Sequence, residues 1–100
     1  MIGKELIDKY VLVRCKAGIF TGILKELEGL TCILENSRRL RYWDGAATIS
    51  ELSQKGVSRP STCEFPAEIP YEFLPEIIEI IPCSDEAQKS IKEVKIWTEH

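Results

Sequence analysis

The segment YVLVRCKAGIFTGILKELEGLTCILE, residues 10–35, decides the fold. Its first part, Tyr10–Cys15, alternates with the two-residue period of a β-strand that has one buried face. Residues 19–27 and 30–35 are predicted as a second and a third strand, joined at 28–29 by a short link of hairpin character. Three strands joined by short links make an antiparallel meander.

The rest of the sheet is predicted from glycine, proline and β-branched residues. Gly22 lies inside the second predicted strand, where a glycine usually marks a bulge or a tight bend of a curved sheet. Four prolines restrict residues 57–75 to edge-strand pieces such as 62–65, without a central strand or a helix. The isoleucine-rich run 76–81, between two prolines, is predicted as the closing strand.

Two helices are predicted from their caps. Residues 48–51 have the S/T-x-x-E form of a capping box, and Gly56 is placed to end that short helix. Ser84 is predicted to cap a final helix that puts Ala87, Ile91 and Val94 on one face. The fold class is therefore α+β and mostly β: a small, strongly bent antiparallel sheet or an SH3/Sm-like barrel, with one short inserted helix and a C-terminal helix.

Composition limits the size and the partners of the protein. The 100 residues are 44% apolar and 29% charged, which predicts one domain over residues 1–100. A net charge of -3 argues against a protein that coats DNA, because such binding neutralises many phosphates. No apolar run reaches the length of a membrane span, so we expect no membrane contact.

The cysteines indicate a reducing compartment. Cys15, Cys32, Cys63 and Cys83 are separated by long, unequal intervals without a C-x-x-C pair, and the only histidine is His100, so we expect no metal site. The start Met-Ile-Gly-Lys lacks the apolar run of a signal peptide. We expect partly buried thiols in a cytoplasm, although an even number of cysteines leaves two disulfides arithmetically open.

The candidate site is the cationic, aromatic segment RRLRYW, residues 38–43, which follows a turn or bulge predicted at 36–37. If it runs extended, its side chains divide between two faces, with Arg39, Arg41 and Trp43 on one and Arg38, Leu40 and Tyr42 on the other. Guanidinium groups bind phosphate oxygens bidentately and aromatic rings stack on bases, so the segment suits a phosphorylated nucleotide.

The following loop is predicted to form the wall of this site. Small side chains in Asp44–Ala47 allow a ligand to approach backbone N–H groups near the start of the predicted helix. The candidate ligand-binding residues are Arg38, Arg39, Arg41, Tyr42, Trp43, Asp44, Gly45, Ala46 and Thr48. A structural alternative stays open, in which the loop is an ordinary turn, the two rings fill the core, and Arg39 and Arg41 pair with Glu26, Glu28 or Glu35.

Catalysis is not expected, and neither is a cofactor. A serine or cysteine nucleophile needs a base, and His100 is the last residue of the chain. Asp44, Glu51 and Glu64 have no spacing that pairs them as an acid and a base. Trp97 is predicted to dock the last helix, or to contact another subunit.

The chain resembles, over nearly its full length, a family of small bacteriophage proteins classified as a domain of unknown function. The matching elements are residues 13–15 with 17–22, 38–47, 52–57 and 77–83. The second carries the pattern Arg-Arg-Leu-x-Tyr-Trp-x-Gly-Ala, with Arg41 where the family pattern has an aromatic residue. The resemblance implies a phage origin, action in the cytoplasm of an infected bacterium, and no chemistry.

Three functions are compatible with these observations. The first is a homo-oligomeric phage protein that sequesters a cyclic nucleotide or an ADP-ribose-derived signal of an antiviral pathway, without turnover. The second is a Sm-like protein that binds RNA through the same arginines. The third is an inhibitor that occupies a basic groove of a host defence protein with an acidic surface.

Overall fold

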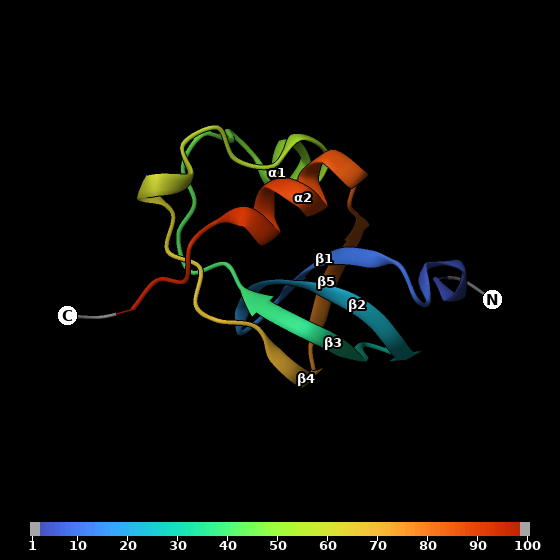
Figure 1. The fold of residues 1–100 in the computed structure, drawn as a ribbon. Coiled ribbons are helices and arrows are strands. Elements are labelled where there is room, and N and C mark those ends of the chain that lie inside the picture. Colours follow the sequence, from blue (N-terminus) through green and yellow to red (C-terminus); the bar gives the residue numbers. More distant parts are fainter. Residues whose placement is uncertain (1–2, 99–100) are drawn as a thin grey trace.

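The computed structural model describes residues 3–98. It shows a bent antiparallel sheet with two α-helices at one end (Figure 1). The strands are β1 Tyr10–Cys15, β2 Gly18–Glu28, β3 Thr31–Arg39, β4 Ile69–Leu74 and β5 Ile77–Pro82. The α-helices are α1 Ile49–Lys55 and α2 Asp85–Glu93, and two short 3-10 turns are η1 Lys4–Leu6 and η2 Pro60–Thr62.

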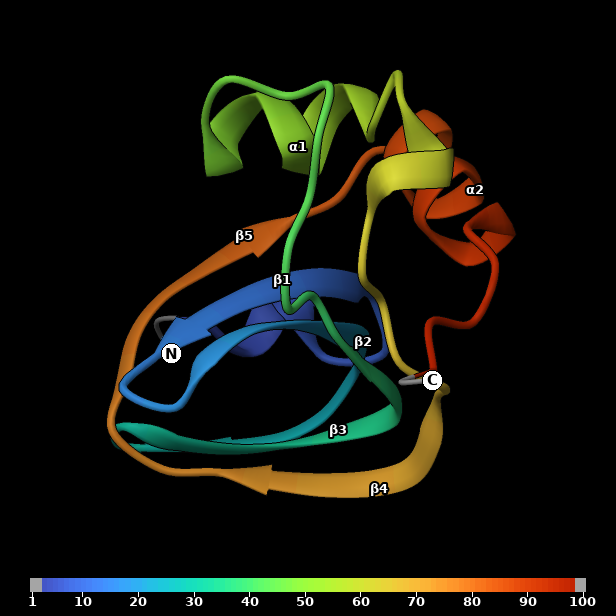
Figure 2. The same cartoon turned by 90° about the vertical axis from the view of Figure 1, so that its left-hand side faces the viewer.

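The sheet has the strand order β4-β3-β2-β1-β5, and each neighbouring pair is antiparallel. β4 and β5 are the two edges, yet only Pro75 and Glu76 separate them in the sequence. So short a link requires the sheet to curl until its two edges approach each other, as Figure 2 shows. The two edge strands are not hydrogen-bonded neighbours, so the observed fold is the predicted bent sheet and not a closed barrel.

The bend has a local cause where β2 pairs with β3. The β2–β3 register shifts between Thr21 and Ile23, where Asn36 and Ser37 of β3 lie opposite Gly22, so the bulge marked by this glycine is carried by β3. A Cβ at Gly22 would lie 3.0 Å from the carbonyl oxygen of Glu35, which explains why a residue without a side chain stands there. Of the turn or bulge predicted at 36–37, the structure has the bulge, and β3 continues through it to Arg39.

Both predicted helix caps are confirmed. Thr48 accepts a 3.1 Å hydrogen bond from the Glu51 amide at the start of α1, and Gly56 ends that helix with φ of 75°. Ser84 accepts a 3.0 Å bond from the Ala87 amide at the start of α2. Within residues 3–98, neither helix is long and apolar enough to cross a bilayer.

The core lies on both faces of β1. Tyr10 and Leu12 face the cluster beneath the helices, while Val11 and Val13 face the cluster inside the bend of the sheet. The prediction of a single buried face for β1 is therefore wrong, because the sheet curls around one side of this central strand and the helices cover the other.

The proline-rich segment also differs from its prediction in detail. Its strand is β4, an edge strand as expected, but it lies after residues 62–65. Residues 60–62 form the turn η2, where no helical residue was expected. Glu64 and Phe65 make isolated bridges to Tyr42 and Ile96, so this segment joins the end of the arginine segment to the C-terminal segment.

Candidate functional site

The RRLRYW segment begins in β3 and leaves the sheet after Arg39. The predicted alternation holds for four residues, because Arg38 and Leu40 are buried while Arg39 and Arg41 are exposed. It then breaks at Tyr42, which is 51% exposed. The segment therefore does not run as one extended strand to Trp43.

Arg38 is a structural clamp. Its side chain is 3% exposed, and its donors reach four backbone carbonyl oxygens at 2.7–3.0 Å, those of Phe65, Pro66, Ile91 and Val94. Burial lowers the pKa of this guanidinium. Because these bonds tie β3 to the end of α2, Arg38 serves the fold, and its predicted role as a ligand contact does not fit its position.

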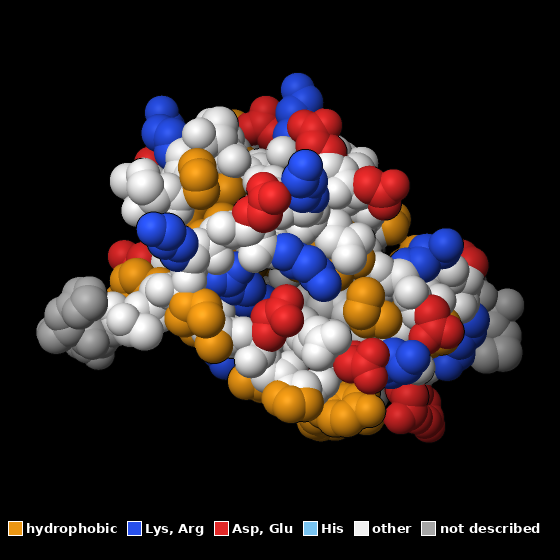
Figure 3. Space-filling model, viewed as in Figure 1, with side chains coloured by type: hydrophobic (Ala, Val, Ile, Leu, Met, Phe, Trp, Pro, Cys, Tyr) orange, Lys and Arg blue, Asp and Glu red, His pale blue; other side chains and the backbone are white. Residues whose placement is uncertain are grey.

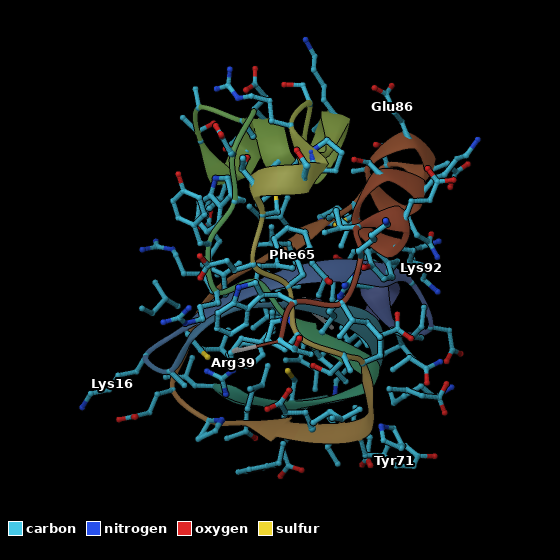
Figure 4. All side chains as sticks on the ribbon, turned by 60° about the vertical axis from the view of Figure 1, so that its left-hand side comes forward. Lys16, Arg39, Phe65, Tyr71, Glu86 and Lys92 are labelled. Atoms are coloured by element: carbon cyan, nitrogen blue, oxygen red, sulfur yellow. The ribbon has the colours of Figure 1, made fainter. Side chains whose placement is uncertain are left out.

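Arg39 lies at the turn between β1 and β2 (Figure 4). Its guanidinium is 4.4 Å from the ring centroid of Phe20 and donates a 3.3 Å hydrogen bond to the carbonyl oxygen of Ala17. A carboxylate oxygen of Glu72 is 3.9 Å away. Arg39 thus has a ring and a carboxylate as partners, and neither partner follows from the sequence pattern.

Arg41, like Arg39, has a carboxylate and an aromatic ring as partners, but it lies at a different place in the molecule. It forms an ion pair with Glu64 and lies 4.6 Å from the ring centroid of Trp97. The backbone of Trp97 is fixed by a 3.0 Å hydrogen bond from its amide to the carbonyl oxygen of Phe65. The aromatic partner of Arg41 is therefore Trp97, and the predicted neighbour Trp43 packs against the core beneath the helices.

A groove of about 390 Å³ adjoins this pair, between η2 and the segment that follows α2. The residues lining it are Pro60, Ser61, Cys63, Glu93, Lys95, Ile96 and Trp97. The indole and Ile96 give it an apolar wall, and Lys95 adds a cation. Figure 1 shows η2 and the C-terminal segment on the same side of the molecule.

The loop 44–47, predicted as the wall of the site, holds η2 in place beside this groove. Asp44 accepts 2.8 Å hydrogen bonds from Arg59 and from the hydroxyl of Thr62, and these bonds, with Arg59 first, hold the pKa of the Asp44 carboxyl below its ordinary value. The Asp44 amide also contacts the sulfur of Cys63 at 3.3 Å. Asp44 therefore positions η2.

The other loop residues have structural partners as well. A Cβ at Gly45 would lie 2.5 Å from the backbone nitrogen of Ser58, so that glycine allows two backbone segments to approach. Ala46 packs against the core. Thr48 caps α1, and the Ala47 amide already donates to the Glu51 carboxylate at 2.7 Å. This part of the predicted site is an ordinary turn before a helix.

The structure thus brings together only part of the predicted site. Arg41 contacts Trp97, which lines the groove, and Tyr42 is exposed and bridged to the segment after η2. Arg39 lies apart from them at the β1–β2 turn. The sequence did not indicate Lys95 or the turn η2 as site residues, because contacts between segments far apart in the chain leave no local pattern. His100 lies outside the described residues.

All four cysteines are thiols in the structure. Burial raises the pKa of Cys32 to about 11 and that of Cys83 to about 12. Burial also raises the pKa of Cys63, a residue that lines the groove. None of these three thiols is activated as a nucleophile.

Fold and site together define a small α+β protein with a groove lined by aromatic, apolar and charged side chains. The chain belongs to a family described as a domain of unknown function (DUF6948), whose model matches residues 8–91. No curated protein matches the chain. The matched range includes the arginine segment and η2, and it ends before Lys95 and Trp97.

Proposed function

We propose that this protein is a small binding protein that holds a phosphorylated nucleotide, without turnover, in the groove beside Trp97. The observation that supports this proposal is the stack of the Arg41 guanidinium on the indole of Trp97. An indole face takes a nucleobase, and a guanidinium takes phosphate oxygens in two parallel hydrogen bonds. Trp97 lines the groove, and Arg41 lies against its ring.

The size and lining of the groove agree with such a ligand. Its volume of about 390 Å³ falls within the usual range for small-molecule sites. Trp97 and Ile96 supply apolar contact for a base, and Lys95 supplies a second cation for phosphate. Ser61 adds a hydroxyl that can donate to a ribose or phosphate oxygen.

Ligand phosphate must compete with Glu64 for Arg41. An exposed arginine–glutamate pair contributes only about 0–1 kcal/mol. A bidentate contact with phosphate is stronger, because both partners are ionised and the geometry of the guanidinium matches the phosphate oxygens. Exchange of Glu64 for phosphate is therefore favourable, and Glu64 sets how tightly the ligand is held.

The biological role that we propose is sequestration. The resemblance to small phage proteins suggests that the chain acts in the cytoplasm of an infected bacterium. There it would bind a cyclic nucleotide or an ADP-ribose-derived signal of an antiviral pathway and so keep that signal from its receptor. A protein with this role needs tight binding and no turnover.

The RNA-binding alternative has less support from the same contacts. Arg39, Arg41 and Arg59 each face a carboxylate, and these belong to Glu72, Glu64 and Asp44. Binding to an RNA backbone needs several cations free to contact successive phosphates. A compact groove next to one stacked arginine suits a small ligand better than a polymer.

A thermal-shift screen tests the proposed function. Cyclic dinucleotides, cyclic mononucleotides, ADP-ribose and its cyclised forms, and linear nucleotides are added to the purified protein. A ligand at one hundred times its dissociation constant adds about 2.7 kcal/mol, which raises the melting temperature of a domain of this size by about 10 °C or more. Mass spectrometry after denaturation should recover that ligand intact, and a screen without any shift at millimolar concentration would contradict the proposal.

A further inference from the structure

The edge strand β4 carries an apolar stripe on its outer face. Ile69, Tyr71 and Phe73 occupy alternate positions and are 43%, 65% and 62% exposed. Glu72 points the other way and accepts a 2.8 Å hydrogen bond from Ser37. The charge of β4 is therefore turned inward, and its apolar side chains are turned out.

Two hollows flank this stripe. One of about 540 Å³ is lined by Lys25, Glu26, Ile33, Tyr71 and Phe73. A smaller one of about 110 Å³ adjoins it, and Phe73 lines both. Figure 3 shows hydrophobic side chains gathered along the lower margin, where Figure 1 places β4, and Figure 4 shows Tyr71 pointing away from the sheet.

The strand itself is open to pairing. β4 bonds to β3 on one side, and among the described residues no strand lies on its other side. Proteins usually protect such edges with charge, and an apolar edge strand attracts another strand. Pro70 removes one donor, but no outward charge protects the middle of this edge. We therefore expect these exposed apolar side chains of β4 to be buried against another protein surface.

We propose that the β4 face is the interface of a symmetric dimer, with a second copy of this chain as the occupant. A two-fold interface must be self-complementary. This face is self-complementary, since it offers a ridge made by Tyr71 and Phe73 and, directly beside it, a hollow that can receive the same ridge from a second copy. The rim carries both signs of charge, Glu26 and Lys25, and Lys25 is paired with Asp8 at 2.6 Å, so the rim presents no block of like charge to a second copy.

The available area indicates a dimer of low affinity. A whole aromatic side chain buries about 150–250 Å², and Tyr71 and Phe73 are 65% and 62% exposed, so the two rings with Ile69 supply about 300 Å² per copy. A standard interface buries about 800 Å² per partner. The apolar stripe covers less than half of that area and the rim must supply the rest, so we expect dissociation in the high micromolar range. This inference concerns residues apart from the nucleotide groove and does not depend on it.

Sedimentation equilibrium between micromolar and submillimolar protein tests the dimer. The wild-type protein should dimerise, and Tyr71→Glu combined with Phe73→Glu should raise the dissociation constant at least about a hundredfold, because each copy brings two like charges into the apolar centre. Ile78→Glu is the matched control, since Ile78 is equally exposed, at 59%, but lies on β5. It should dimerise like the wild type.

A second measurement shows whether the double variant is correctly folded. Circular dichroism should give the double variant the melting curve of the dilute wild type, because both rings are already exposed. Hydrogen exchange of the β4 amides in the wild type should slow as concentration rises. A wild type that stays monomeric throughout, a dimer that survives the double substitution, or a dimer lost through Ile78→Glu would each overturn the proposal.

Discussion

The guanidinium of Arg38, in β3, donates a 2.7 Å hydrogen bond to the carbonyl oxygen of Val94, the residue at which α2 ends. A second bond of 2.8 Å reaches the carbonyl of Ile91. The last carbonyls of a helix have no partner within the helix, and the helix dipole favours a cation there. One side chain of the sheet therefore caps the helix that covers it.

Loss of Arg38 should destabilise the fold more than loss of any exposed arginine. Arg38→Met leaves buried carbonyls without donors, and we expect a loss of about 3 kcal/mol in the free energy of unfolding. Arg38→Lys should recover only part of it, because an ammonium cannot reach four carbonyls with a planar fork. Urea unfolding measures both, with Arg14→Met as the exposed control, and equal stability of the Arg38 and Arg14 variants would contradict the clamp.

Gly45 should be harder to replace than Gly29. Both have positive φ, 92° and 57°, so alanine strains the backbone at either position. Only at Gly45 would the new Cβ meet a backbone atom, the Ser58 nitrogen at 2.5 Å, whereas nothing lies within 4 Å of a Cβ at Gly29. Thermal melting should therefore show Gly45→Ala to be less stable than Gly29→Ala by about 1–3 kcal/mol, and a reversed order would contradict this packing.

The Asp44 carboxylate should stabilise the fold at neutral pH and lose that effect in acid. Arg59 and Thr62 lower its pKa in the folded protein. A lowered pKa adds stability above the unfolded value, about 4, and that stability disappears as the pH falls through the folded value. The stability difference between wild type and Asp44→Asn should therefore shrink in acid. Arg59→Gln should raise the Asp44 pKa, measured by NMR, and an unchanged pKa would refute the pairing.

The buried thiols should react slowly in the native protein. Cys32 and Cys83 have pKa values raised by burial, so little thiolate is present at neutral pH. Mass spectrometry after brief iodoacetamide treatment should find these two unmodified, and both alkylated once the chain is unfolded in urea. Excess reductant should leave the melting temperature unchanged, and a large drop would instead indicate a disulfide.

Local patterns predicted the elements of this fold well. The caps at Thr48 and Ser84 depend on side chains close in the sequence, and Gly22 marks the position of a bulge; the structure has both caps, and a bulge of β3 opposite Gly22. The turn or bulge predicted at 36–37 is a bulge, because Asn36, with φ of 53°, is accommodated within β3. Pairing with strands on both sides holds β3 in place across that residue.

The candidate site was less predictable, for a physical reason. Three arginines close together in the sequence need anions to balance their charge, but the sequence does not show which carboxylates pair with them. The carboxylate partner of Arg41 is Glu64 and that of Arg39 is Glu72. The sequence pattern instead pointed to glutamates of β2 and β3 as the partners. The stack of Arg41 on Trp97 likewise depends on the path of the chain after α2, which only the tertiary structure determines.

The central claim is that Arg41, freed from Glu64, holds a nucleotide phosphate beside Trp97. Isothermal titration with ADP-ribose and with a cyclic dinucleotide, chosen by the thermal-shift screen, tests it directly. Arg41→Gln should weaken binding by about tenfold or more, while Glu64→Gln should tighten it a fewfold by removing the competing carboxylate. The matched pair Arg14 and Glu79, also exposed and 3.1 Å apart, supplies the controls Arg14→Gln and Glu79→Gln, which should bind like the wild type. Equal affinity of Arg41→Gln and the wild type for a ligand that does bind would contradict the claim.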